Sequence, residues 1–137
     1  MPTTRQYTVI THKVALTIIE RAIVEGEKLG VPVSVTVVDP WMNLVAFAKA
    51  DGATPHSVDS SRRKANTAAS TRRPTGWMKD DLALPLPLAT DMKLTNIIGG
   101  YPLTFESETA GGLGVAGGTP DQDAQIAATA AAYALEL

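Results

Sequence analysis

The sequence contains no cysteine, so disulfides, thiolate metal sites and thiol nucleophiles are excluded, and His, Asp and Glu remain as the strong metal ligands. No apolar run approaches the roughly 18 residues that a membrane-spanning helix needs, and the first residues lack the basic and apolar segments of an export signal. The net charge of −2 provides no general attraction for nucleic acid, and aromatic residues make up only 5% of the chain. We therefore expect a cytoplasmic protein without membrane or nucleic-acid partners.

What the sequence does contain is the composition of one folded domain. Of its 137 residues, 45% are hydrophobic and 19% are charged, a balance that is usual for globular proteins. A chain of this length can bury a core without help from metals or disulfides. We expect a single domain over residues 1–137.

The first part of the chain predicts a helix followed by a pair of strands. Thr11 is a helix-capping residue type, and small or apolar residues then recur at steps of three and four up to Gly30, which ends the predicted helix. Alternating valines in residues 31–39 predict a strand, and residues 44–49 predict its antiparallel partner across a turn at 40–43.

The second part of the chain again predicts a helix followed by a pair of strands, with a proline-rich stretch between them and a last helix after them. Thr54 and Pro55 predict the start of a second helix. Residues on one side of that helix are Val58, Arg62, Ala65, Ala68 and Ala69. Residues 77–84 predict a short helix and residues 85–92 an extended loop. A second hairpin is predicted over residues 97–117 with its turn at 107–109, and an alanine-rich helix is predicted from there to residue 137.

Strands that come in hairpins favour an antiparallel sheet. The predicted fold class is therefore α+β, with an antiparallel sheet flanked by helices in the order α-β-β-α-α-β-β-α.

Gly112, Gly114 and Gly117 form a G-x-G-x-x-G pattern directly before a helix start. A dinucleotide fingerprint needs a further strand with an acidic residue about 20 positions later, and no such strand follows. We expect the glycines of the last strand instead to mark a place where a helix or another subunit comes close.

The helix start after these glycines is a candidate anion site. Thr119, Pro120 and Gln122 predict a capping box with proline at the first helical position. The free amides of a helix N-terminus attract carboxylates and phosphates, although acidic residues in the first turn compete for them. The candidate ligand-binding residues here are Gly117, Gly118 and Asp121.

Several short motifs spread over most of the chain resemble one known family. They are the valine strand ending in Asp39, Leu44-Val45 with Asp51-Gly52-Ala53, Lys64-Ala65 with Thr67-Ala68, Gly99-Gly100-x-Pro102, and Gly114-Val115-x-Gly117-Gly118 before Asp121 and Asp123. Together they resemble the GlcG/HbpS-like family of haem-binding or haem-degrading domains, which also form the C-terminal part of PduO-type proteins. The resemblance implies an antiparallel sheet with helices on its sides, assembly into dimers or larger oligomers, and haem as the candidate cofactor.

Two segments depart from the family pattern. The turn at residues 40–43 lacks the family's usual glycine, and Asn43 is the expected left-handed residue there. Trp41, in the same turn, is a candidate ligand contact. Residues 77–96 also differ from the usual segment. Because ligand contacts in the family are reported mainly at surfaces and subunit boundaries, these departures concern the ligand more than the fold.

Two histidines are candidate haem-iron ligands. His12 lies in the first turn of the predicted first helix, where the helix dipole disfavours the imidazolium form. His56 lies at the start of the second helix and is also a candidate acid or base. A solvated helix-start residue without a ligand role is the alternative for each.

Consecutive basic residues on the second helix cannot all face solvent. Arg62, Arg63 and Lys64 point about 100° apart on a helix, so at least one is turned toward the sheet or a partner. We expect Lys64 to be partly buried and paired either with Asp39 or with a bound carboxylate. The arginines that would attract haem propionates or a small organic acid are Arg62, Arg63, Arg72 and Arg73.

Two functions from different classes follow. In the first, the protein binds haem or another anionic small molecule near the second helix or a subunit interface, with His12 or His56 on the iron. In the second, it is a cofactor-independent isomerase or lyase for an organic acid, in which Lys64 and Arg63 bind the carboxylate and His56 or Asp39 transfers the proton. A homo-oligomer is expected under either, because the alanine-rich faces at 65–69 and 127–132 allow close helix contacts.

Overall fold

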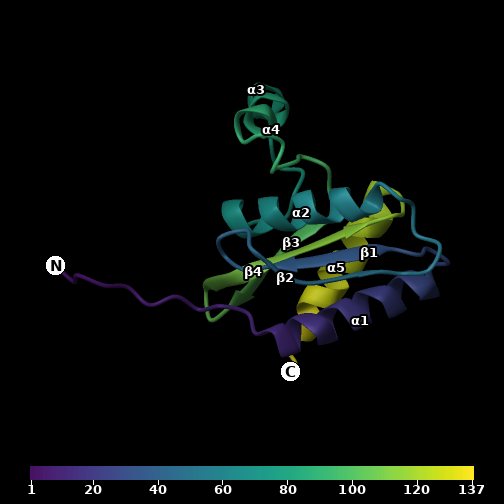
Figure 1. Ribbon diagram of the computed structural model, residues 1–137, viewed down its shortest axis with the longest axis horizontal. Helices are drawn as coiled ribbons and strands as arrows, with labels where there is room; N and C mark the ends of the chain where they lie inside the picture. The colour runs from purple at the N-terminus through teal and green to yellow at the C-terminus, as the bar shows by residue number, and fades with distance from the viewer.

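A four-stranded antiparallel sheet with helices on both faces forms the body of the protein (Figure 1). The computed structural model describes residues 1–137. The strands, in the spatial order β2-β1-β4-β3, are β1 (Ser34–Val38), β2 (Leu44–Lys49), β3 (Gly100–Phe105) and β4 (Glu108–Ala116). The helices are α1 (His12–Lys28), α2 (Ser57–Thr71), α3 (Asp80–Ala83), α4 (Pro85–Ala89) and α5 (Pro120–Ala134). The predicted α+β class and element order are confirmed.

The two faces of the sheet are packed differently. Helices α1 and α5 cover one face, and the core of 18 buried residues between them and the sheet includes Val35, Leu113 and Ile126. Helix α2 covers the other face, where the buried apolar cluster is only Val38, Ala65 and Ala69. No helix combines the length and apolarity that crossing a bilayer requires.

Helix α2 lies unusually close to strand β4. A Cβ atom at Gly114 would overlap the backbone carbonyl oxygen of Ser61, and one at Gly112 would overlap that of Ala65. Two hydrogen bonds between hydroxyl groups, Ser34 to Ser57 at 2.7 Å and Thr36 to Ser61 at 2.8 Å, join the same helix to β1. The close helix approach expected from the strand glycines is therefore confirmed, and its cause is α2.

The predicted caps of the first and last helices are also confirmed. The Thr11 hydroxyl accepts a hydrogen bond from the Val14 amide at the start of α1. At the start of α5, Thr119 accepts from the Gln122 amide, and the Gln122 side chain accepts from the Thr119 amide. Both helices thus begin where the sequence indicates.

Several local predictions were wrong. Helix α2 begins at Ser57 rather than at Thr54-Pro55, and the side that it turns to the sheet includes Ser61 instead of Val58 and Arg62. Residues 85–89 form helix α4 and not an extended loop. In the turn at 40–43 the left-handed residue is Met42, with φ 65°, rather than Asn43.

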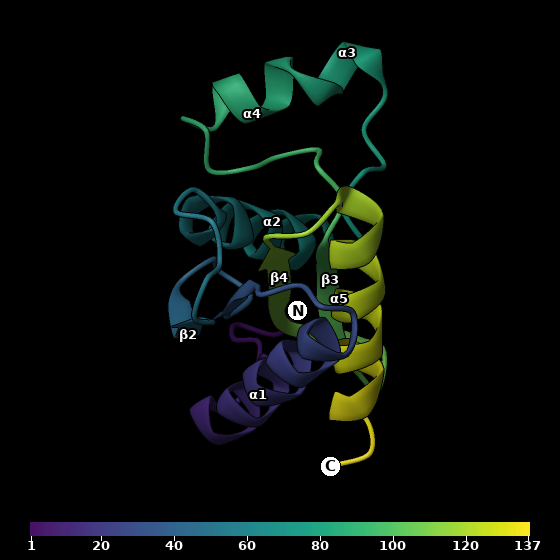
Figure 2. The ribbon, with the colours of Figure 1, turned by 90° about the vertical axis from the view of Figure 1, so that its right-hand side faces the viewer.

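Residues 77–97, which we call the arm, carry α3 and α4 beyond the outer surface of α2 (Figure 2). The Asn96 side chain closes the base of the arm, since it accepts from the Met78 amide and donates to the Met78 carbonyl. The returning segment is fastened to α2, where Arg63 Nε donates to the Met92 carbonyl at 2.8 Å. Asn66 donates to the Lys93 carbonyl at 3.0 Å in the same way. The arm is therefore fastened to the middle of α2 and forms a wall above its outer surface.

Candidate functional site

An almost fully buried ion pair connects α2 to the start of α5. Lys64 Nζ lies 3.0 Å from Asp123 Oδ2 and donates a second hydrogen bond to the Val115 carbonyl at 2.9 Å. The other carboxylate oxygen of Asp123 accepts from the Gly118 amide at 2.9 Å. Both charged side chains are 3% exposed. The expected burial of Lys64 next to the sheet is confirmed, and it is almost complete rather than partial.

The predicted partner of Lys64 was wrong. Asp39 lies in the turn after β1, where its carboxylate accepts hydrogen bonds from the Trp41 amide at 2.8 Å and the Asn43 amide at 3.0 Å. Lys64 instead reaches Val115, which pairs with Val35 at the opposite end of β1. Four strand residues, roughly 13 Å, separate that point from Asp39. Asp39 is therefore a turn-forming residue and does not share a site with Lys64.

Burial changes the acid–base property of Lys64. Removal of the ammonium group from water lowers the pKa of Lys64 from its ordinary value of 10.5, and the negative charge and hydrogen bond of Asp123 oppose part of this decrease. The amine is thus easier to deprotonate than a solvated lysine.

Two adjoining cavities lie beside Lys64, and we call them together the α2 trough. The first, of about 370 Å³, lies between α2 and the turn after β4, and its lining includes His56, Gly117 and Gly118. The second, of about 440 Å³, lies between α2 and the arm, and its lining includes Arg63 and Leu84. Ser60, Lys64 and Ile97 line both cavities.

Helical spacing explains why these polar groups meet in one place. His56, Ser60 and Lys64 are four residues apart, so they follow one another along one side of the helix, and Arg63 is beside them. The trough therefore contains an imidazole, a hydroxyl, an amine and a guanidinium. Opposite them, the arm contributes apolar residues, which are Ala83, Leu84, Pro87, Met92, Leu94 and Ile97.

The structure does not bring all predicted site residues into the trough. Arg62 points toward the β1–β2 turn, where its guanidinium donates to the Met42 carbonyl at 3.1 Å and to Asn66. Asp121 is exposed in the first turn of α5. His12 is exposed at the start of α1, on the face of the sheet opposite α2 (Figure 1). His56, Lys64, Arg63, Gly117 and Gly118 remain as the predicted residues that line the trough.

Sequence reasoning missed Asp123 as the partner of Lys64. The sequence indicates Asp123 only as one of two acidic residues, with Asp121, in the first turn of α5. A signal was present, because Asp123 lies three and four residues before Ile126 and Ala127 and so continues the buried stripe of that helix. An acidic residue in line with an apolar stripe indicates a buried carboxylate that needs a cation.

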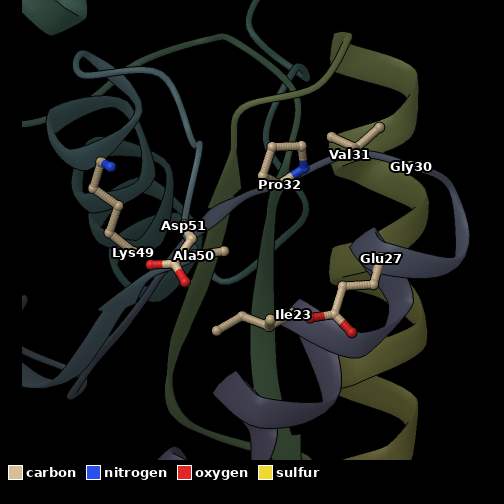
Figure 3. Close-up of a pocket in the computed structure, with 8 residues that line it drawn as sticks. All are labelled: Ile23, Glu27, Gly30, Val31, Pro32, Lys49, Ala50 and Asp51. Atoms are coloured by element: carbon tan, nitrogen blue, oxygen red, sulfur yellow. The ribbon is translucent and has the colours of Figure 1, made fainter.

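The largest cavity, of about 590 Å³, lies away from these residues, between the end of α1 and the end of β2 (Figure 3). Its charged lining residues are Glu27, Lys49 and Asp51. In Figure 3 the Lys49 side chain extends away from Glu27, and no ion pair joins it to either carboxylate. These groups do not converge on a common point, so the α2 trough is the better candidate site.

Comparison with known proteins gives one consistent result. The family model described as "Haem degrading protein HbpS-like" matches residues 10–132. Protein GlcG of Escherichia coli is 34% identical over 108 residues, which cover 78% of this chain and 81% of GlcG.

Solved structures agree with the sequence matches. A double mutant of Streptomyces reticuli HbpS has a TM-score of 0.86 at 36% identity, over 97% of this chain and 92% of that chain. The structure described as a PduOC:heme complex has a TM-score of 0.83 at 27% identity, over 91% of this chain and 94% of that chain.

Proposed function

Because this chain belongs to the HbpS-like family, we propose that it binds haem, or another anionic small molecule with an apolar body, in the α2 trough. The observation that carries this proposal is the composition of the trough, in which Arg63 on α2 faces an apolar wall from the arm and His56, at the N-cap of α2, lines the adjoining cavity. A ligand with a metal or proton-accepting centre, an apolar surface and carboxylates matches these three features.

The protein's metal-ligating groups fit haem better than a bare metal ion. No group of three or more His, Asp or Glu side chains is placed to hold a metal. A single imidazole is a sufficient protein ligand when a porphyrin supplies the remaining nitrogen ligands. In the trough that imidazole is His56, which is exposed on one side and has no side-chain hydrogen bond to hold it elsewhere.

The spacing along α2 suits a ligand with its charges at one edge. His56 and Arg63 are separated by seven residues, or roughly 10 Å of helical rise. Arg63 donates hydrogen bonds from Nε to the Met92 carbonyl and from Nη1 to the Asp59 carbonyl. Its Nη2 is therefore free to bind a propionate. Haem, when bound, supplies a redox-active iron, whereas the protein residues hold it, orient it and shield one face from water.

An absorbance titration with hemin tests this proposal. The unmodified protein is expected to give a saturable Soret shift. His56→Ala should lose the shift, and Arg63→Gln should weaken binding by about tenfold, as expected for one charge-assisted hydrogen bond. His12→Ala is the matched control and should bind as the unmodified protein does. Non-saturating binding, or loss of the shift in His12→Ala alone, contradicts the assignment.

A second candidate function is proton transfer on an organic acid. The supporting observation is that Lys64, with its lowered pKa, and His56 line one cavity of about 370 Å³. Arg63 lines the adjoining cavity and would bind the carboxylate, whereas Asp39 lies too far away to take part.

Deuterium exchange tests this second candidate. Small 2-oxo and 2-hydroxy acids are incubated with the protein in D₂O, and exchange is followed by NMR at C3 of the 2-oxo acids and at C2 of the 2-hydroxy acids. Exchange faster than in buffer, and lost in His56→Gln, supports the enzyme. Exchange at the buffer rate for every acid contradicts it.

We also propose that the protein associates with itself through the arm. Leu84, Leu88 and Ile97 are each more than half exposed, and all three belong to the arm. An apolar surface of this kind is typical of a protein–protein contact. Leu84 and Ile97 also line the trough, so the second subunit would lie against the bound ligand.

A further inference from the structure

A separate cavity of about 260 Å³ lies at the opposite end of α2, and we call it the Trp41 pocket. Its lining comes from the N-terminal segment, the β1–β2 turn, the end of α2 and the β3–β4 turn. The polar and aromatic lining residues include Arg5, Trp41, Ser70, Arg72 and Glu108. Eight positions along the chain separate Arg72 from Lys64 of the trough, which corresponds to roughly 12 Å along a helix, and the pocket shares no lining residue with the trough. The pocket is therefore distinct from the site of the proposed function.

The pocket holds two arginines whose charge the protein does not neutralise. The four ion pairs of the chain involve neither Arg5 nor Arg72. Neither guanidinium donates a side-chain hydrogen bond, although Arg62 and Arg63 each donate two. Glu108 is the single carboxylate in the lining, and one of its oxygens accepts from the Thr8 hydroxyl. Two cations and one anion give the pocket a net charge of +1.

An aromatic surface stands beside these charges. The Trp41 side chain is 51% exposed, and the ring of Tyr7 meets it edge-on, with centroids 5.0 Å apart and planes at 67°. Arg5 lies over the Tyr7 ring at 5.0 Å. The edge-on contact leaves indole surface available for stacking by a planar ring.

The backbone holds the two main groups in place. The Trp41 amide donates to the Asp39 carboxylate at 2.8 Å, which fixes the turn that carries the indole. Arg72 ends α2 in the left-handed conformation at φ 62°, and its amide donates to the Ala68 carbonyl at 2.9 Å. The indole and the guanidinium thus extend from ordered backbone at two different elements.

We propose that the Trp41 pocket binds a small aromatic monocarboxylate, with its carboxylate on Arg72 and Arg5 and its ring against Trp41. The volume decides the size of the ligand, because about 260 Å³ is below the roughly 300–1,000 Å³ of sites for drug-sized molecules. A single ring fits and haem does not. The net charge of +1 matches a monoanion, and a guanidinium binds a carboxylate with two parallel hydrogen bonds.

Fluorescence of a variant with one tryptophan tests the proposal. Trp77→Phe leaves Trp41 as the only indole, since the chain has two tryptophans. Benzoate is expected to quench this fluorescence with a saturable curve. Cyclohexanecarboxylate has the same charge without a π system, and inorganic phosphate has charge without a ring, so both are expected to bind more weakly. Equal or tighter binding of either probe overturns the aromatic assignment.

Neighbouring arginines provide the matched control. Arg72→Gln, made in the Trp77→Phe protein, is expected to weaken benzoate binding by about tenfold, as for one charge-assisted hydrogen bond. Arg73→Gln should not change the affinity for benzoate, because Arg73 does not line the pocket. Its guanidinium instead lies over the Trp77 ring, 3.5 Å from the ring centroid. Glu108→Gln should strengthen binding by removing the one negative charge. Equal losses in the two arginine variants, or no saturation, overturn the proposal.

A hemin titration separates this site from the trough. Arg72→Gln should keep the hemin response of the unmodified protein, while His56→Ala should keep the benzoate response. If benzoate binding disappears in His56→Ala and persists in Arg72→Gln, the ligand lies in the trough and the Trp41 pocket is not its site.

Discussion

Lys64 and Asp123 are the two charged residues that the fold buries almost completely. Removal of one partner leaves the other charge buried without compensation, which typically costs about 3–5 kcal/mol. We therefore expect Lys64→Met to lower the free energy of unfolding by that amount, measured by chemical denaturation. The double variant Lys64→Met, Asp123→Leu should recover most of the loss, because no charge then remains buried.

Arg63 provides the control for this experiment. Its ion pair with Asp59 has an N–O distance of 3.7 Å, and its Nε donates one hydrogen bond to the Met92 carbonyl, so Arg63→Met should cost less than about 2 kcal/mol. A single Lys64→Met variant that is no less stable than Arg63→Met contradicts the interpretation of the buried pair.

The lowered pKa of Lys64 makes stability depend on pH in a defined direction. Between the folded-state pKa and the ordinary value of 10.5, the unfolded chain holds a proton that the folded chain has released. Unfolding then takes up a proton, so this residue makes the free energy of unfolding rise with pH across that window. NMR titration of Lys64 Nζ should give a midpoint below 10.5. A midpoint at or above this value contradicts the burial argument.

Single residues show what the sequence can and cannot indicate about the site. Lys64 could be predicted as buried because adjacent basic residues on a helix cannot all reach solvent. Its partner could not be derived in the same way, because the pairing of β1 with β4 decides which carboxylate lies near, and that pairing joins residues about eighty positions apart. His56 and Gly117 were predicted separately, and the fold brings them to one cavity.

Strand β4 and helix α2 are held closer together than side chains would allow. A methyl group at Gly114 would overlap the Ser61 carbonyl, and the flanking strands and helix leave little room to move apart. We expect Gly114→Ala to destabilise the protein by about 3 kcal/mol, the upper end for overpacking, as measured by thermal or chemical denaturation.

Gly30 offers a comparison at a position without crowding. A Cβ atom there meets nothing within 4 Å, although its φ of +72° is unfavourable for other residues. Gly30→Ala should therefore cost only the roughly 1–2 kcal/mol of a left-handed conformation. If both variants lose the same stability, contact with α2 is not the cause of the Gly114 effect.

Whole elements were easier to predict where one periodic pattern extends over many residues. Helices α1 and α5 have clear caps and buried stripes at steps of three and four, and the start of each was located correctly, although α5 ends at Ala134 rather than at the last residue. Helix α4 was missed because Pro85 and Pro87 suggest an extended chain. Both prolines lie in the first turn, where the missing amide hydrogens have no helical partner in any case.

At the scale of the whole molecule, the exposed leucines of the arm predict self-association. Leu84 is 65% exposed and Leu88 is 59% exposed. We expect size-exclusion chromatography with light scattering to show an oligomer for the unmodified protein. The double variant Leu84→Glu, Leu88→Glu should shift it toward the monomer, because two carboxylates cannot be buried in an apolar contact without large cost.

Leu135 is the matched control for association, since it is 64% exposed and caps the C-terminal end of α5. That end of α5 lies far from the arm in both views of the ribbon (Figures 1 and 2). Leu135→Glu should leave the mass unchanged. A monomeric unmodified protein, or an equal change in the control, contradicts association through the arm.

The central strand pair of the sheet has a consequence for biosynthesis. Strand β1 has its two neighbours at very different positions, β2 directly after it and β4 at residues 108–116. During translation, the β1–β2 hairpin emerges early from the ribosome with its valines facing water and one edge open. Strand β1 can pair with β4 only after residue 116 has left the exit tunnel. Until then the sheet is incomplete, and the part of the chain already synthesised is accessible to chaperones and proteases.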